Sequence, residues 1–269
     1  MKKITFIVAV IAVAMFTSCK GKATKEKTIT TDIKTKIEAY LTPEIKTNLD
    51  SLVATMKQLD KLPLFVHRAN GKYQLTEKAK KVKPDYLLSL EKAKGFTTRS
   101  EKAAAIGMYM VDMAIQDIYE MPNDEHKAVI KKLFIEAGLP VLDFDAGEID
   151  RNKHLELMYK ESLKSKSTDV LFTLLTASLL ESLYANIESV DIISSVFTDA
   201  DVQNTLTRLQ VLNEAISALI PYHPEMNKLN TVLMPVYGIN ATTVKEFESE
   251  LLRLKKDVIT VREYMINTK

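Results

Sequence analysis

The chain is short of glycine, cysteine and tryptophan, and two of these shortages exclude classes of function. Its 269 residues include 7 glycines, one cysteine and no tryptophan. A phosphate-binding loop of the Walker type needs two glycines five positions apart, and a dinucleotide-binding loop needs three within six. The closest pair in this chain, Gly138 and Gly147, fits neither spacing. Nucleotide sites built on glycine-rich loops are therefore excluded.

The single cysteine, Cys19, stands near the start of the chain. A mature protein that begins there has no second thiol, so it has no internal disulfide, no zinc site built from several thiolates and no further cysteine nucleophile. The oxidising cell envelope is compatible with such a composition.

The first residues have the pattern of an export signal. Lys2 and Lys3 precede an apolar run from Ile4 to Phe16 that only Thr5 interrupts. A basic start followed by a short apolar segment is typical of a secretory signal peptide, whereas a membrane-spanning helix needs roughly 20 apolar residues. We interpret residues 1–18 as a signal peptide.

The end of this run, Phe16-Thr17-Ser18-Cys19, resembles the lipobox of bacterial lipoproteins. The resemblance implies that Cys19 becomes the acylated N-terminus, where several acyl chains hold the protein to a bilayer at ~0.8 kcal/mol per buried methylene. The alternatives are an ordinary signal peptide and an uncleaved anchor.

A lysine-rich stretch follows the cysteine. Residues 20–36 contain six lysines and two acidic residues. We interpret residues 19–30 as a solvated tether; the alternative is a patch that rests on anionic headgroups. Residues 37–269 carry a net charge of −4, given +2 for the whole chain. Lys20 directly after the cysteine, with no acidic cluster behind it, resembles the sorting pattern of the periplasmic face of the outer membrane.

The rest of the chain reads as helices separated by proline, glycine and capping residues. Apolar residues recur at helical spacing and strand-type alternation is absent. Residues 62–84, with an Asn70-Gly71 turn signal, are expected to form a loop. The sequence predicts one all-α domain over residues 31–269, an antiparallel helical bundle of about eight or nine helices. The expected helices are 43–61, a short one near 85–94, 97–119, 123–137, 145–163, 168–194, 199–220, 224–237 and 241–266.

Two helices are apolar nearly all round, which predicts that they form the core. Each also carries one stripe of polar residues at intervals of three and four. We expect the two stripes to meet as a polar cluster made by Tyr109, Asp112, Gln116, Tyr119, Glu181 and Tyr184. Two interpretations stay open: a pocket for a cationic or polyhydroxyl ligand or a hard metal ion, or tyrosine hydroxyls that satisfy buried carboxylates.

The same motifs carry a family resemblance. Gly107-Met108-Tyr109 with Asp112 and Tyr119, and the later run Glu181-Ser182-Leu183-Tyr184, resemble a family of helical lipoproteins from Bacteroidetes-type Gram-negative bacteria. The resemblance covers about residues 83–220. It implies an envelope location, an all-helical fold and no established activity.

No familiar catalytic or metal motif is present. The four histidines lack zincin or di-iron spacing. Acidic residues at 143–150 depart from a calcium loop, because Gly147 and Glu148 are misplaced; they are interpreted as helix caps. Ser89 and Lys92 have the spacing of penicillin-recognising enzymes without the accompanying motifs. We therefore expect no catalytic residues, no metal ligands and no cofactor, and the acidic body argues against nucleic acid.

The sequence thus favours an outer-membrane-anchored periplasmic lipoprotein that acts as a binding or scaffold module. Its expected partners are the membrane, through lipid on Cys19, and an envelope protein. The alternative is a carrier of a small ligand or metal in the interior polar pocket around Asp112 and Glu181. A third class, an enzyme that uses only carboxylates and tyrosines, is the least favoured.

Overall fold

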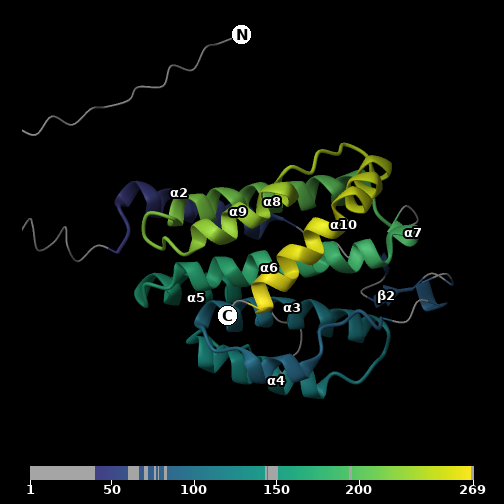
Figure 1. Ribbon diagram of the computed structural model, residues 1–269, viewed down its shortest axis with the longest axis horizontal. Helices are drawn as coiled ribbons and strands as arrows, with labels where there is room; N and C mark the ends of the chain where they lie inside the picture. Colours follow the sequence, from purple (N-terminus) through teal and green to yellow (C-terminus); the bar gives the residue numbers. More distant parts are fainter. Residues whose placement is uncertain are drawn as a thin grey trace, which may run out of the picture. The chain divides into compact units, whose positions relative to one another are not determined.

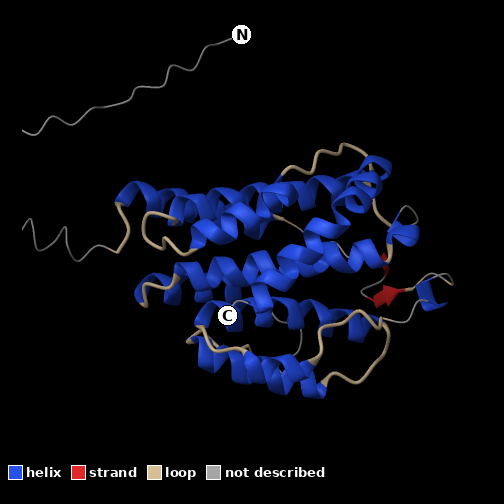
Figure 2. Ribbon diagram, in the orientation of Figure 1, coloured by secondary structure: helices blue, strands red, loops and turns tan. Residues whose placement is uncertain are grey.

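The described part of the chain is helical except for one short hairpin, as Figure 2 shows for the computed structural model. The structure describes residues 40–59, 67–69, 72–75, 77, 79–81, 84–142, 144, 151–193 and 196–267. Leu41–Lys269 form one compact unit. The signal peptide, Cys19, the tether, the acidic residues at 145–150 and the expected domain start at residue 31 lie outside the described residues.

Nine α-helices run through the described residues, which confirms the predicted all-α fold. Their antiparallel arrangement stays a prediction. The helices are α2 (Pro43–Gln58), α3 (Arg99–Ile118), α4 (Asp124–Ala137), α5 (Arg151–Lys164), α6 (Thr168–Glu188), α7 (Val190–Ile193), α8 (Asp199–Leu219), α9 (Met226–Tyr237) and α10 (Val244–Asn267). Two 3₁₀ turns, η1 (Ala79–Lys81) and η2 (Leu90–Gly95), precede α3.

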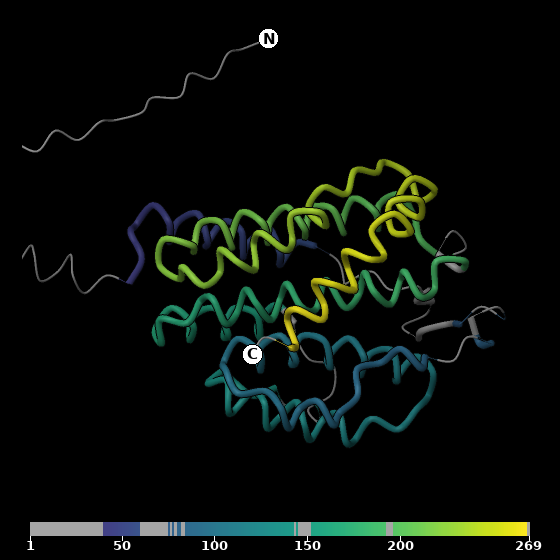
Figure 3. Tube along the Cα trace, in the orientation of Figure 1, coloured from purple at the N-terminus to yellow at the C-terminus, as the bar shows by residue number. Residues whose placement is uncertain are grey.

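The helices of this unit form layers around α6. One side of α6 packs on α3, which packs in turn on α4. The other side packs on α8, whose outer neighbours are α2 and α9 (Figure 1). The last helix, α10, crosses these layers obliquely and contacts α6, α3 and α9; its path is visible in Figure 3.

The two helices expected to be central are the most buried ones. In α6, 17 of 21 residues are buried, and in α3, 13 of 20. Among the described residues, α6 is also the one helix long and apolar enough to cross a membrane, with a mean hydropathy of 1.5 over its most apolar window. Since 83% of that window is buried by other helices, α6 is the core helix of this unit.

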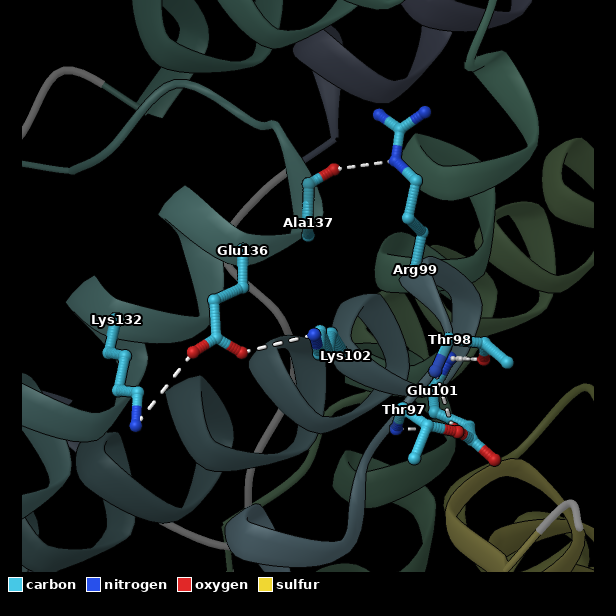
Figure 4. A network of polar contacts seen from close by, with 8 residues as sticks. All are labelled: Thr97, Thr98, Arg99, Glu101, Lys102, Lys132, Glu136 and Ala137. Carbon is cyan, nitrogen blue, oxygen red and sulfur yellow. Dashed lines mark hydrogen bonds and ion pairs between the residues drawn. The ribbon is translucent and has the colours of Figure 1, made fainter.

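The start of α3 is tied both to its own backbone and to α4. The Thr98 side chain accepts from the Glu101 N–H at 3.1 Å, and the Glu101 carboxylate accepts from the Thr98 N–H at 2.8 Å, a capping box. Arg99 Nε donates to the carbonyl of Ala137 at 3.0 Å, and Lys102 lies 3.1 Å from Glu136 (Figure 4). These contacts hold the N-terminus of α3 against the C-terminus of α4.

A two-stranded hairpin occupies part of the segment expected to be a loop. β1 (His67–Ala69) pairs antiparallel with β2 (Lys72–Gln74), with Ala69 opposite Lys72. The connection between the strands is Asn70-Gly71, which lies outside the described residues. Asn-Gly is the preferred pair for a two-residue hairpin turn, so this dipeptide also indicates a strand on each side of it.

Candidate functional site

The facing sides of α3 and α6 bring two carboxyl groups together in the interior. Asp112 of α3 and Glu181 of α6 each have 0% of their surface exposed to solvent. The charge of Glu181 acts on Asp112 strongly enough to raise the pKa of Asp112, although burial is the larger cause. We call Asp112, Glu181, Tyr184, Arg262 and Tyr86 the buried cluster.

Arg262 of α10 neutralises Glu181. Its Nε donates to Glu181 Oε2 at 2.6 Å and its Nη2 donates to Oε1 at 2.8 Å, a bidentate pair. The guanidinium also lies over the ring of Tyr184, with its central carbon 4.4 Å from the ring centroid. Helix α10 thus supplies the positive charge that pairs with the buried Glu181 carboxylate.

Asp112 accepts one hydrogen bond from the backbone, and its surroundings disfavour the charged form. The Leu88 N–H donates to Asp112 Oδ2 at 2.9 Å, while Oδ1 has no hydrogen-bond partner among the described residues. Burial and the nearby Glu181 carboxylate raise the pKa of Asp112 well above its ordinary value. With one arginine for two carboxyl groups, a proton on Asp112 would leave the cluster without net charge.

The segment that precedes α3 packs against the cluster. The rings of Tyr86 and Tyr184 meet edge to face with centroids 6.0 Å apart. The Tyr109 hydroxyl donates to the carbonyl of Ser89 at 2.9 Å. Burial raises the pKa of both Tyr86 and Tyr109. Residues 86–89 therefore contact α3 and α6 beside the cluster, through the Tyr86 ring and the Leu88 N–H.

The remaining two predicted members lie further along α3. Gln116 is buried, and its Oε1 has no partner among the described residues. Tyr119 is the residue after α3 and is partly exposed; burial raises its pKa. Tyr119 is near enough to Tyr86 to raise the pKa of Tyr86 slightly. Both residues extend the polar stripe along α3.

Sequence reasoning missed Arg262 and Tyr86. Arg262 had a detectable signal, because it stands beside Val258 and Val261 on a stripe of α10 that is buried. A cation inside an apolar stripe marks a buried anion on a neighbouring helix. Tyr86 had no such signal, since the segment before α3 has no periodicity from which a facing direction can be read.

The geometry favours a structural interpretation of the cluster. Asp112 and Glu181 are both 0% exposed, and the Arg262 guanidinium takes the hydrogen bonds that a cationic ligand would make to Glu181. The partners differ from those expected: the Tyr109 hydroxyl donates to a backbone carbonyl, and an arginine satisfies the carboxylate. A guanidinium supplies two donors and a charge, which a phenol does not.

The Asp112→Asn variant is expected to gain stability relative to the wild type as pH rises. A carboxyl group whose folded pKa is raised contributes stability below its unfolded pKa of 3.8, and this contribution is lost as pH rises through the folded pKa. Asparagine keeps an acceptor for the Leu88 N–H and has no proton to lose. Urea unfolding from pH 4 to pH 8 measures the difference.

The matched control is Asp85→Asn, which changes an exposed carboxylate in the segment just before the cluster. Its stability relative to the wild type is expected to stay nearly constant over the same pH range. An Asp112→Asn curve parallel to that of the wild type would show that Asp112 is ionised in the folded protein.

The fold and the cluster define an all-α protein in which Asp112 and Glu181 are buried and Glu181 is paired with Arg262. A scan against protein-family models and searches among curated proteins and solved structures found no match. The resemblance to helical lipoproteins therefore stays a prediction from the motifs around Tyr109 and Glu181.

Proposed function

We propose that this protein is a lipoprotein of the periplasmic face of the outer membrane that serves as a binding or scaffold module without catalysis. The observation that carries the proposal is the apolar run Ile4–Phe16, which ends three residues before the only cysteine, Cys19. Acyl chains on Cys19 would place the helical body at a membrane surface. The lysine-rich tether would separate the two.

Replacing Cys19 by alanine is expected to abolish fatty-acid labelling and to move the protein from the membrane fraction to the soluble fraction. Cys19 is the only cysteine of the chain, so no other thiol can take its place. Metabolic labelling with an alkyne fatty acid, followed by fractionation of the envelope on a density gradient, measures both effects and separates inner from outer membrane.

The matched control is Ser18→Ala, which keeps a small residue before the cysteine and should retain label and location. Label that persists in Cys19→Ala, or a wild-type protein without label, would contradict the anchoring. Wild-type protein in the inner-membrane fraction would contradict the location and leave the anchor intact.

The binding role is tested from exposed apolar side chains of the body. Ile135 of α4, Met234 of α9 and Leu252 of α10 are 69%, 57% and 57% exposed. A photocrosslinker at each position in living cells should yield a discrete adduct from at least one, compared with Glu125, an exposed polar position on α4. Absence of adducts from all three positions would argue against a stable envelope partner.

The alternative of a carrier with an interior pocket around Asp112 and Glu181 has less support. Both carboxyl groups are fully buried, and Arg262 already pairs with Glu181 through two hydrogen bonds. A ligand there would have to displace Arg262 and leave its charge unpaired, which costs several kcal/mol.

A further inference from the structure

A second group of ionisable side chains lies at the junction of α6 with the connection between α8 and α9. His223 Nδ1 lies 3.4 Å from Asp169 Oδ1 and 3.3 Å from Glu225 Oε1. One ligand atom from each residue lies within 4.8 Å of the other two. Asp169 is in the first turn of α6, so tertiary packing alone brings it to the other two residues.

The two separations from His223 match the coordination sphere of a small divalent metal ion, and the third pair of ligand atoms lies within 4.8 Å. Tetrahedral bonds of 2.0–2.1 Å, as zinc makes to imidazole nitrogen and carboxylate oxygen, place neighbouring ligand atoms roughly 3.3–3.4 Å apart. Both measured distances from His223 Nδ1 fall in this range. One imidazole and two carboxylates also neutralise a dication. The geometry points to a divalent transition-metal site, of the zinc class, formed by Asp169, His223 and Glu225.

The backbone presents two of these ligands in a rigid segment. Prolines at 221 and 224 flank His223 and restrict the backbone φ angle at their own positions. The His223 N–H donates to the carbonyl of Leu219 at 2.9 Å, and the His223 carbonyl accepts from Met226 at 2.9 Å. The ligand segment is therefore held in place before any ion binds, which lowers the entropic cost of binding.

The third ligand leaves the site open on one side. The Glu225 side chain is 61% exposed, whereas those of His223 and Asp169 are each 12% exposed. Glu225 stands at the N-cap of α9 without a capping hydrogen bond, so its carboxylate can turn to an ion. It also lines an open cleft of about 460 Å³ shared by α3, α6, α9 and α10. A fourth coordination position would face this cleft and take water or an anionic ligand.

Basic side chains of α3 and α9 also bear on the group. Arg99 at the start of α3 acts on Asp169, and its positive charge opposes a cation there. Lys228 of α9 lines the same cleft but lies over the Tyr264 ring, 5.0 Å from its centroid. Burial raises the pKa of Asp169, while the His223 and Arg99 charges lower it.

Zinc titration of the full-length protein in detergent, after treatment with a chelator, tests the site. We expect one equivalent of Zn²⁺ to bind to the wild type, and a loss of at least ~10-fold in affinity in Glu225→Gln, since even outer-sphere changes at metal sites cost 10–100-fold. His223→Asn should abolish binding. Glu44→Gln, an exposed glutamate of α2, should bind as the wild type does. Co²⁺ absorption reports the coordination number.

Two outcomes overturn the site. The first is a wild type that binds no Zn²⁺ at tens of micromolar, which would leave the three residues as an ion-paired contact between α6 and the α8–α9 connection. The second is equal Zn²⁺ affinity in the wild type, His223→Asn and Glu225→Gln, which would place the ion elsewhere. Should His223→Asn fail to fold by circular dichroism, Glu225→Gln decides, because its side chain is mostly exposed.

Discussion

Replacing Arg262 by methionine is expected to lower the free energy of unfolding by about 3–5 kcal/mol, the usual effect of removing one partner of a buried ion pair. The change leaves Glu181, which is 0% exposed, without its two guanidinium donors. Methionine fills a similar volume, so the loss reports the unpaired carboxylate rather than a cavity. Urea unfolding at pH 7, followed by far-UV circular dichroism, measures it.

The same substitution at Arg253 is the matched control. Arg253 pairs with Glu250 on the exposed side of α10 at 2.7 Å, where solvent screens the charges. Arg253→Met should therefore change stability far less than Arg262→Met. The double variant Glu181→Met/Arg262→Met should recover most of the loss, because it removes both buried charges. Equal losses at positions 253 and 262 would contradict the role of the buried pair.

Replacing Gly107 by alanine has the second-largest expected effect, a net loss of about 1–3 kcal/mol from overpacking. A Cβ at Gly107 would lie 2.3 Å from the carbonyl oxygen of Leu174 and 2.9 Å from the amide nitrogen of Ser178. Both are backbone atoms of α6, so α3 and α6 must move apart. This separation would outweigh the ~1 kcal/mol by which alanine favours a helix over glycine.

Gly95→Ala is the control for Gly107→Ala. A Cβ at Gly95 would meet no atom within 4 Å, so the variant is expected to be as stable as the wild type. The Gly107→Ala substitution should also weaken the hydrogen bond that the Ser178 hydroxyl donates to the carbonyl of residue 107, which is 3.2 Å long with glycine there. A Gly107→Ala protein as stable as Gly95→Ala would show that the α3–α6 contact is looser than described.

The close α3–α6 contact and the buried cluster depend on each other. Gly107 lets the two helices approach, and one turn further along α3 the same approach brings Asp112 beside Glu181. Arg262 of α10 pairs with Glu181 of α6, and it also interacts electrostatically with Asp112 of α3. The cluster therefore links α3, α6 and α10 through polar side chains. The proposed zinc site lies on a different part of α6.

Several helix boundaries were predictable because they rest on local hydrogen bonds. α3 was expected over 97–119 from its threonines and is found at Arg99–Ile118, capped by Thr98. The end of α4 at Gly138, with a φ of 68°, follows from the left-handed conformation that glycine adopts easily. The helix expected over 168–194 was too long: α6 ends at Glu188, and α7 starts at Val190. No proline or glycine marks that break.

The polar cluster was only partly predictable. The stripes on α3 and α6 follow from spacing of three and four residues, so Asp112 and Glu181 were expected to meet. The partner of Glu181 was not, because Arg262 lies 81 residues further along the chain on a helix whose crossing angle no local pattern specifies. The contact between His223 and Asp169 was not predicted for the same reason. Spacing in the sequence does not indicate which residues of distant helices pack together.

The amino-acid sequence alone was enough for the helical class of the body, the two core helices and the capping residues, because helix propensity, periodicity and caps act within a few residues. It is also the whole basis for the anchor proposed at Cys19. Three contacts required the tertiary structure: the Arg262–Glu181 ion pair, the hydrogen bond from the Leu88 N–H to Asp112, and the contact between His223 and Asp169. Buried charges are satisfied by whatever packing brings into contact, and that contact is a property of the folded chain as a whole.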